Sequence, residues 1–126
     1  MSQNQRRIIP IYTSNGSAEA FLVFPHLFNR NGEWIGWVTA KREVYSVMGA
    51  YVGYLSDDPR IIRRRAEDEF KPRLQPPQQP AKITLPASIP LAPLMSDLPL
   101  NLVDVLLEQP ERLHTLDSGE LRQDMD

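Results

Sequence analysis

The first half of the chain repeats one pattern of aliphatic, aromatic and glycine positions three times. The units are residues 11–22 (IYTSNGSAEAFL), 27–38 (LFNRNGEWIGWV) and 44–55 (VYSVMGAYVGYL), at offsets of 16 and 17 residues. In each unit the first position is aliphatic, the second aromatic, the sixth glycine, the tenth alanine or glycine, the eleventh aromatic and the twelfth aliphatic. Such self-similarity is typical of a repeated structural unit.

Each unit predicts a β-hairpin. The first two units carry Asn-Gly, at 15–16 and 31–32, which strongly favours a hairpin turn, and the third keeps the glycine as Gly49. Because side chains alternate along a strand, the tenth and twelfth positions share one face and the aromatic eleventh position takes the other. The small residue at the tenth position indicates backbones that converge near a crowded axis. We therefore expect hairpins that radiate from a centre.

A fourth unit is visible only at its start. Residues 61–62 (Ile-Ile) lie 17 residues after 44–45, but arginines at 64–65 replace the turn and its glycine. Residues 66–71 are strongly charged and favour a short helix or an extension. Either the last unit is incomplete or its turn has a different chemistry.

The three units resemble the four-fold β-flower family over about residues 8–65. The resemblance implies four β-hairpins arranged as petals about a pseudo-four-fold axis. It also implies a small bacterial protein of unknown function, with no catalytic residues to carry over. The expected fold is mainly β, with three clear hairpins and a partial fourth in a pseudo-four-fold arrangement, followed by a proline-rich extended segment and a short C-terminal α-helix.

The second half has a different composition. All but three of the 12 prolines lie at or after Pro72, and every aromatic residue lies at or before Phe70. Proline fixes φ and removes a backbone donor, so residues 71–100 cannot form a helix or a central strand. They predict either a semi-rigid spacer or an extended strap that lies in a groove. The strap is favoured by their apolar content, namely Ile83, Leu85, Ile89, Leu91, Leu94 and Met95.

The segment after Pro99 has helical periodicity. Asn101 is a good N-cap, and Pro110 ends the predicted helix. A helix of about two turns is marginal alone, so it must dock on this chain, a second copy or a partner. Its docking face, which we predict to bind a partner, consists of Leu102, Val103, Leu106 and Leu107. The predicted organisation is a hairpin domain (1–70), a strap or linker (71–100), a docking helix (101–114) and a disordered acidic tail (115–126).

Charge and cysteine content narrow the function classes. Residues 1–75 carry eleven basic and eight acidic side chains, whereas residues 76–126 carry three and eight, so the two parts can attract each other. The absence of cysteine excludes disulfides, thiolate nucleophiles and cysteine-ligated metal sites. No apolar run approaches the roughly 18 to 20 residues of a membrane span, and residues 1–10 lack the apolar stretch of a signal peptide. We expect a cytoplasmic protein.

The polar residues do not form a recognisable catalytic or metal-binding pattern. His26 and His114 are the two histidines and lie far apart in sequence, whereas a zinc site needs three or four converging ligands. The serines have no nucleophile-elbow context. The acidic groups at 57–58 and 67–69 lack the spacing of a calcium loop. We expect no enzymatic activity, no metal and no cofactor.

Two functional hypotheses follow. The first is a non-enzymatic protein-interaction or self-assembly module, a homo-oligomer in the second case, because a chain of this size cannot readily bury all of its apolar tail. The second is a nucleic-acid-associated protein, because clustered arginines near aromatic rings suit phosphates and bases. Packing within the repeats also explains those aromatic residues. The cluster that would contact nucleic acid is Arg60, Arg63, Arg64 and Arg65.

Overall fold

The fold is one antiparallel sheet in which every strand pairs with the next along the chain. The computed structural model describes residues 7–66 and 71–117. The eight strands are β1 (Ile9–Tyr12), β2 (Ala18–Val23), β3 (His26–Phe28), β4 (Trp34–Val38), β5 (Glu43–Ser46), β6 (Tyr51–Leu55), β7 (Ile61–Arg64) and β8 (Leu102–Asp104). Two short helices follow, α1 (Val105–Glu108) and the 3-10 helix η1 (Pro110–Arg112). The mainly β fold predicted from the repeats is confirmed.

The three sequence repeats are three equivalent hairpins, β1–β2, β3–β4 and β5–β6. The first position of each unit pairs with the tenth, as Ile11 with Ala20 and Val44 with Gly53. The turn glycines all have positive φ, between +78° and +89°, which a residue with a Cβ adopts only at a cost. The third position adds a side-chain acceptor, since Asn29 Oδ1 accepts the N–H of Glu33 at 3.0 Å and Ser46 Oγ that of Ala50 at 3.2 Å. This recurring Thr, Asn or Ser is a turn signal that the sequence analysis missed.

The fourth hairpin is completed by residues from beyond the proline-rich segment. Strand β7 pairs with β8, with Ile62 opposite Asp104 and Arg64 opposite Leu102. The predicted helix over 101–109 is therefore wrong at its start, because its first residues form β8 and α1 has only four residues. The backbone groups of β7 need partners, and β8 supplies them, which outweighs a helical pattern of two turns. Of the two alternatives, the first holds: the last unit is incomplete in the local sequence, and a distant strand completes its hairpin in place of an altered turn.

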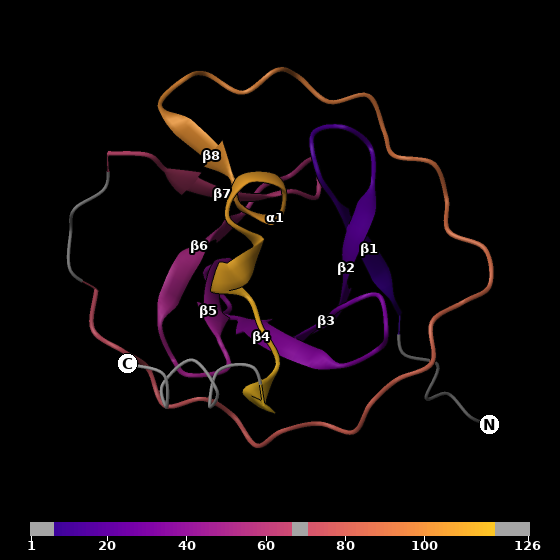
Figure 1. Ribbon diagram of the computed structural model, residues 1–126, viewed down its shortest axis with the longest axis vertical. Coiled ribbons are helices and arrows are strands. Elements are labelled where there is room, and N and C mark those ends of the chain that lie inside the picture. Colours follow the sequence, from indigo (N-terminus) through magenta and orange to yellow (C-terminus); the bar gives the residue numbers. More distant parts are fainter. Residues whose placement is uncertain (1–6, 67–70, 118–126) are drawn as a thin grey trace.

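The main core lies on one face of the sheet, beneath the C-terminal helices. It combines sheet residues such as Leu27 and Val44 with Val105 and Leu106 of α1 and with Leu113 just beyond η1. Figure 1 shows α1 over the centre, with the four hairpins around it. The centre is as crowded as the small tenth position predicted, because a Cβ added at Gly36 would come within 2.8 Å of the Leu113 side chain.

A second, smaller cluster lies on the other side of the hairpin strands. Phe28, Trp34 and Val47 form it, and Ile83 of the strap and Leu116 pack against it. Of the tail predicted to be disordered (115–126), residues 115–117 are described and the rest lie outside the described residues. The charged stretch at 67–70 lies outside them as well. Within the described part of the chain, no helix is long and apolar enough to cross a membrane.

Candidate functional site

The proline-rich segment, residues 71–100, is a strap that runs round the outside of the hairpins (Figure 1). It reaches one hairpin turn every nine residues, with Leu74 at the third turn, Ile83 at the second and Ala92 at the first. The N–H of Leu74 donates to the Gly49 carbonyl and that of Ile83 to the Gly32 carbonyl, both at 3.0 Å. The strap thus passes the hairpins in reverse order before β8 completes the fourth.

The turn glycines have a second task that the sequence analysis did not assign. A Cβ at Gly32 would overlap the Ile83 carbonyl oxygen, and a Cβ at Gly49 would overlap that of Leu74. At Gly16 the nearest atom to an added Cβ is the Ala92 Cβ, at an ordinary 3.9 Å. Glycine at the second and third turns therefore provides both the positive φ and the space in which the strap lies.

Side chains of the sheet hold the strap at further points. The Tyr12 hydroxyl donates to the Pro90 carbonyl at 2.7 Å, and Arg65 Nε donates to the Leu100 carbonyl at 2.9 Å. Near the start of the strap, the Lys71 ammonium lies 3.6 Å from a Glu43 carboxylate oxygen and 4.5 Å from the centre of the Tyr51 ring. These contacts fix both ends of the strap to the sheet.

The last third of the strap, residues 89–100, has a three-residue period, and we call it the outer arc. Its sequence, IPL-APL-MSD-LPL, places half-buried residues at the first position of every triplet. Residues at the third position face solvent, with Leu91, Leu94 and Leu100 exposed at 95%, 102% and 91%. A polyproline II helix has three residues per turn, so the period puts these leucines on one ridge, with exposed Asp97 between Leu94 and Leu100. The repeated Pro-Leu pair was the sequence signal for this ridge.

Two of the four residues predicted to bind a partner are buried inside the protein itself. Val103 and Leu106 are buried, Leu102 is half-buried, and Leu107 is 45% exposed. A helix over this segment would have placed all four side chains on one face. Instead, Val103 is buried within strand β8. The prediction that these four residues form one docking face is wrong, because a strand begins the segment.

The four arginines predicted to contact nucleic acid do not form one cluster. Arg60 is buried and its guanidinium bonds to Asp58, with Nε 3.2 Å from Oδ1. Arg65 forms an ion pair with Glu108 at 3.3 Å. Arg63 is half-buried, and its guanidinium lies 3.4 Å from the Val52 carbonyl. Arg64 is exposed to solvent. Arg60 is thus a structural residue, and a phosphate could not reach it.

Arg60 belongs to a polar seam that joins the first hairpin to the fourth. Its Nη1 donates to Ser14 Oγ at 2.9 Å, and the Ser14 backbone N–H and hydroxyl both donate to Oδ2 of buried Asp104, at 2.6 and 2.7 Å. The Tyr12 N–H also donates to the Pro59 carbonyl at 2.8 Å. Since β1 and β8 are not paired in the sheet, these contacts hold the first and last hairpins together.

The seam lowers the pKa of Asp58. Burial alone would raise it, but hydrogen bonds from Arg60 and Ser56 and the charge of Arg60 together hold the pKa of this carboxyl below its ordinary value. Asp58 therefore carries its charge down to a lower pH in the folded protein than in the unfolded chain.

No group of three or more His, Asp or Glu side chains in residues 7–66 and 71–117 is placed to hold a metal ion. An open groove of about 550 Å³ lies beside the β2–β3 loop, lined by Arg7, Ile9, Val23, Phe24, Pro25 and His26. Phe24 is 61% exposed there.

Comparison with known proteins identifies the family. No curated protein and no solved structure matches the chain. The sequence model described as 4-fold beta flower protein matches residues 9–97, which is well over half of the chain. The match extends beyond the hairpins, where the resemblance was expected to end, and includes most of the strap. The chain therefore belongs to the 4-fold beta flower protein family.

Proposed function

We propose that this protein is a non-enzymatic protein-interaction module and that its binding surface is the outer arc, residues 89–100. The observation that carries the proposal is the ridge formed by Leu91, Leu94 and Leu100, each more than nine-tenths exposed. Burying apolar surface is the main driving force of protein association. A row of leucines that the chain does not bury itself is a surface that a partner can use.

The way in which the arc is held strengthens the proposal. The Pro90 carbonyl is bonded to Tyr12 and the Leu100 carbonyl to Arg65, so the backbone is fixed at both ends of the ridge. Proline restricts φ between these points. A partner would therefore bind a segment whose conformational entropy is already largely lost, which favours affinity.

The nucleic-acid hypothesis has less support from the same structure. Two of its four arginines are occupied, Arg60 by Asp58 and Arg65 by Glu108. Phosphate binding needs several cations that can reach the backbone together. Each leucine of the ridge is more than nine-tenths exposed, whereas Arg60 is buried, so the interaction module is the function we favour.

Photo-crosslinking in the cells that make the protein tests the proposal. A photoreactive phenylalanine at Leu94 should give a covalent adduct of discrete mass with another protein chain, whatever that chain is. The control carries the same group at Gln78, an exposed residue of the strap outside the outer arc. Absence of an adduct from Leu94, or equal adducts from both positions, would refute the outer arc as a binding surface.

A further inference from the structure

Two apolar features of this molecule are exposed, one on the strap and one in a loop of the sheet. One is the outer arc, on the strap. The other is Phe24, 61% exposed in the loop between β2 and β3. Among the large apolar side chains that the structure describes, Phe24 and the three arc leucines have the highest exposures. Single exposed leucines are normal on protein surfaces. An exposed apolar ridge and an apolar groove on the same chain can be explained together if the ridge binds in the groove.

The groove beside Phe24 has the composition of a receptor for extended proline-rich segments. It is lined by the apolar residues Ile9, Val23 and Pro25 and by the aromatic residues Phe24 and His26. Domains that recognise polyproline II segments do so in shallow grooves lined by aromatic side chains. The groove is open, with a volume of about 550 Å³.

The outer arc has the composition of the matching ligand. Pro90 and Pro93 have the spacing Pro-x-x-Pro, and the arc has the period of a polyproline II helix. Its one charged residue, Asp97, is exposed, whereas the groove contains exposed Arg7. Both surfaces are thus apolar, and they carry opposite charges, Asp97 on the arc and Arg7 at the groove.

We propose that the outer arc of one copy of this chain binds in the Phe24 groove of a second copy. This inference rests on the proposed function and names its partner. The contact must be intermolecular, because the arc is held on its own rim by the Tyr12–Pro90 and Arg65–Leu100 bonds and by the bond from the Leu102 N–H to the Pro99 carbonyl at 3.0 Å. No arc residue lines the groove of its own chain, and these bonds keep the arc in that position.

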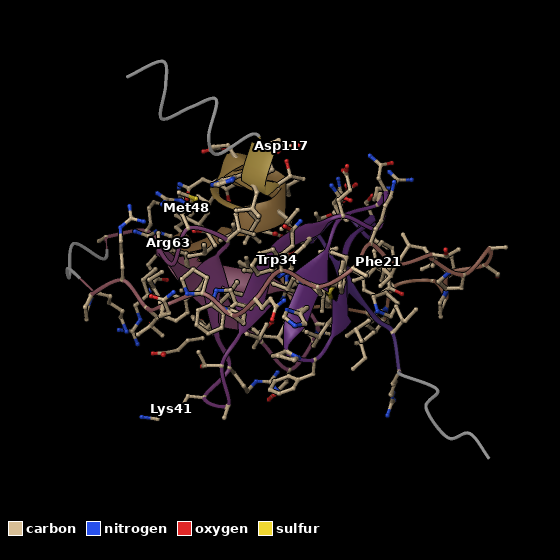
Figure 2. All side chains as sticks on the ribbon, turned by 90° about the horizontal axis from the view of Figure 1, so that it is seen from below. Phe21, Trp34, Lys41, Met48, Arg63 and Asp117 are labelled. Atoms are coloured by element: carbon tan, nitrogen blue, oxygen red, sulfur yellow. The ribbon has the colours of Figure 1, made fainter. Side chains whose placement is uncertain are left out.

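The proposed contact joins two different surfaces, the outer arc of one copy and the Phe24 groove of the other. Figure 2 shows that the loop carrying Lys41 lies on the side of the sheet away from Asp117 and the C-terminal helices, while the strap passes round the molecule between the two sides. The β2–β3 loop, like the Lys41 loop, connects one hairpin to the next. One copy therefore contributes its outer arc, and the other contributes the groove beside its β2–β3 loop. Each copy keeps one unused surface, which can bind a third copy or form the reciprocal contact within the same dimer.

Complementation between two variants tests the proposal by sedimentation velocity at increasing concentrations up to about 1 mM, where even weak contacts are populated. The arc variant carries Leu91→Asp and Leu94→Asp, and the groove variant carries Phe24→Asp, with Phe24→Ser as a milder form. We expect the wild-type chain to associate and each variant alone to associate at least about tenfold more weakly. The equimolar mixture should form a heterodimer, because the arc variant retains its groove and the groove variant retains its arc.

A matched control carries Gln78→Asp and Gln79→Asp, two exposed strap positions outside the arc, and should associate as the wild type does. Thermal unfolding of every variant checks that the fold is kept, as the exposure of the substituted residues predicts. A wild-type chain that stays monomeric at every concentration, or a mixture that fails to form the heterodimer, would overturn the inference. If Leu94 then crosslinks to a different protein, the proposed function stands and only the second copy is excluded.

Discussion

The hairpins and the strap are both ordered, but different interactions order them. Residues 9–64 exchange backbone hydrogen bonds strand by strand and bury the aliphatic positions of the repeat. In the strap, two backbone N–H groups bond to hairpin turns, and most side chains of residues 71–100 are exposed. The hairpins are held by burial, whereas the strap is held by a few fixed backbone contacts and by the restricted φ of its prolines. A segment can thus be well placed without contributing much to the core.

The largest expected change in the free energy of unfolding compares a buried residue and an exposed residue of the short helix α1. Val105→Asp places an uncompensated charge among fully buried residues and should lower the free energy of unfolding by about 4 kcal/mol or more. Leu107→Asp, on a residue that is 45% exposed, should change it by less than about 1 kcal/mol. Urea denaturation of both variants measures the difference. Equal effects would mean that α1 does not pack on the sheet as described.

The second effect measures how much the strap depends on the hairpin turns. Gly32→Ala and Gly16→Ala both impose a positive φ on alanine, at a cost of about 1–2 kcal/mol. At Gly32 the new Cβ also overlaps the Ile83 carbonyl, which should add about 1–3 kcal/mol, whereas at Gly16 there is space.

The difference between the two alanine variants in the free energy of unfolding isolates the strap contact, since the conformational cost is common to both. Limited proteolysis of the strap should also be faster in Gly32→Ala than in Gly16→Ala. Identical unfolding and proteolysis in the two variants would show that the strap is not seated on the second turn.

A smaller, pH-dependent effect tests the seam between the first and fourth hairpins. The pKa of Asp58 is lowered in the folded state, so the folded protein binds fewer protons than the unfolded chain as the pH falls. The stabilisation is present above the ordinary aspartate pKa of about 3.9 and is lost as the pH falls through the lower folded value. Thermal unfolding between pH 6 and pH 2.5, compared with Asp58→Asn, should show a smaller loss of Tm in the variant. The same pH dependence in both proteins would contradict the seam.

The smallest effect concerns a single bond between the sheet and the outer arc. Tyr12→Phe removes the hydroxyl that donates to the Pro90 carbonyl and should lower the free energy of unfolding by about 1 kcal/mol or less. Because Pro90 is in the arc, protease cleavage between residues 89 and 100 should become faster. Tyr54→Phe is the control, since the Tyr54 hydroxyl is in none of the strap contacts. Unchanged cleavage in Tyr12→Phe would show that other contacts hold the arc.

The sequence predicted the hairpins well because their information is local. Each unit contains its own turn glycine and the alternation that sets its faces, and in the structure the first and tenth positions of each unit pair. The site residues were harder to predict. Leu102 and Val103 fit a helical period as well as a strand, and nothing within a two-turn segment decides between them.

The arginines illustrate the same limit. Arg60 and Arg65 stand in one basic run, yet Arg60 is buried against Asp58 and Arg65 pairs with Glu108 at the end of α1. A charge run records neither burial nor partners that are distant in sequence. The outer arc carried a local signal, the Pro-Leu triplets, but exposure of its leucines depends on which side of the strap meets the hairpins.

By itself, the sequence determined the three hairpins, the division of their residues between two faces and the extended character of residues 71–100, because turn chemistry, strand alternation and proline act over a few residues. The tertiary structure alone decided that the strap encircles the hairpins, that β8 returns to pair with β7 and that Val105, Leu106 and Leu113 close the core. These features join residues far apart in the chain. They are selected by the pairing of exposed backbone groups and by the burial of apolar surface in the complete fold, which no local pattern contains.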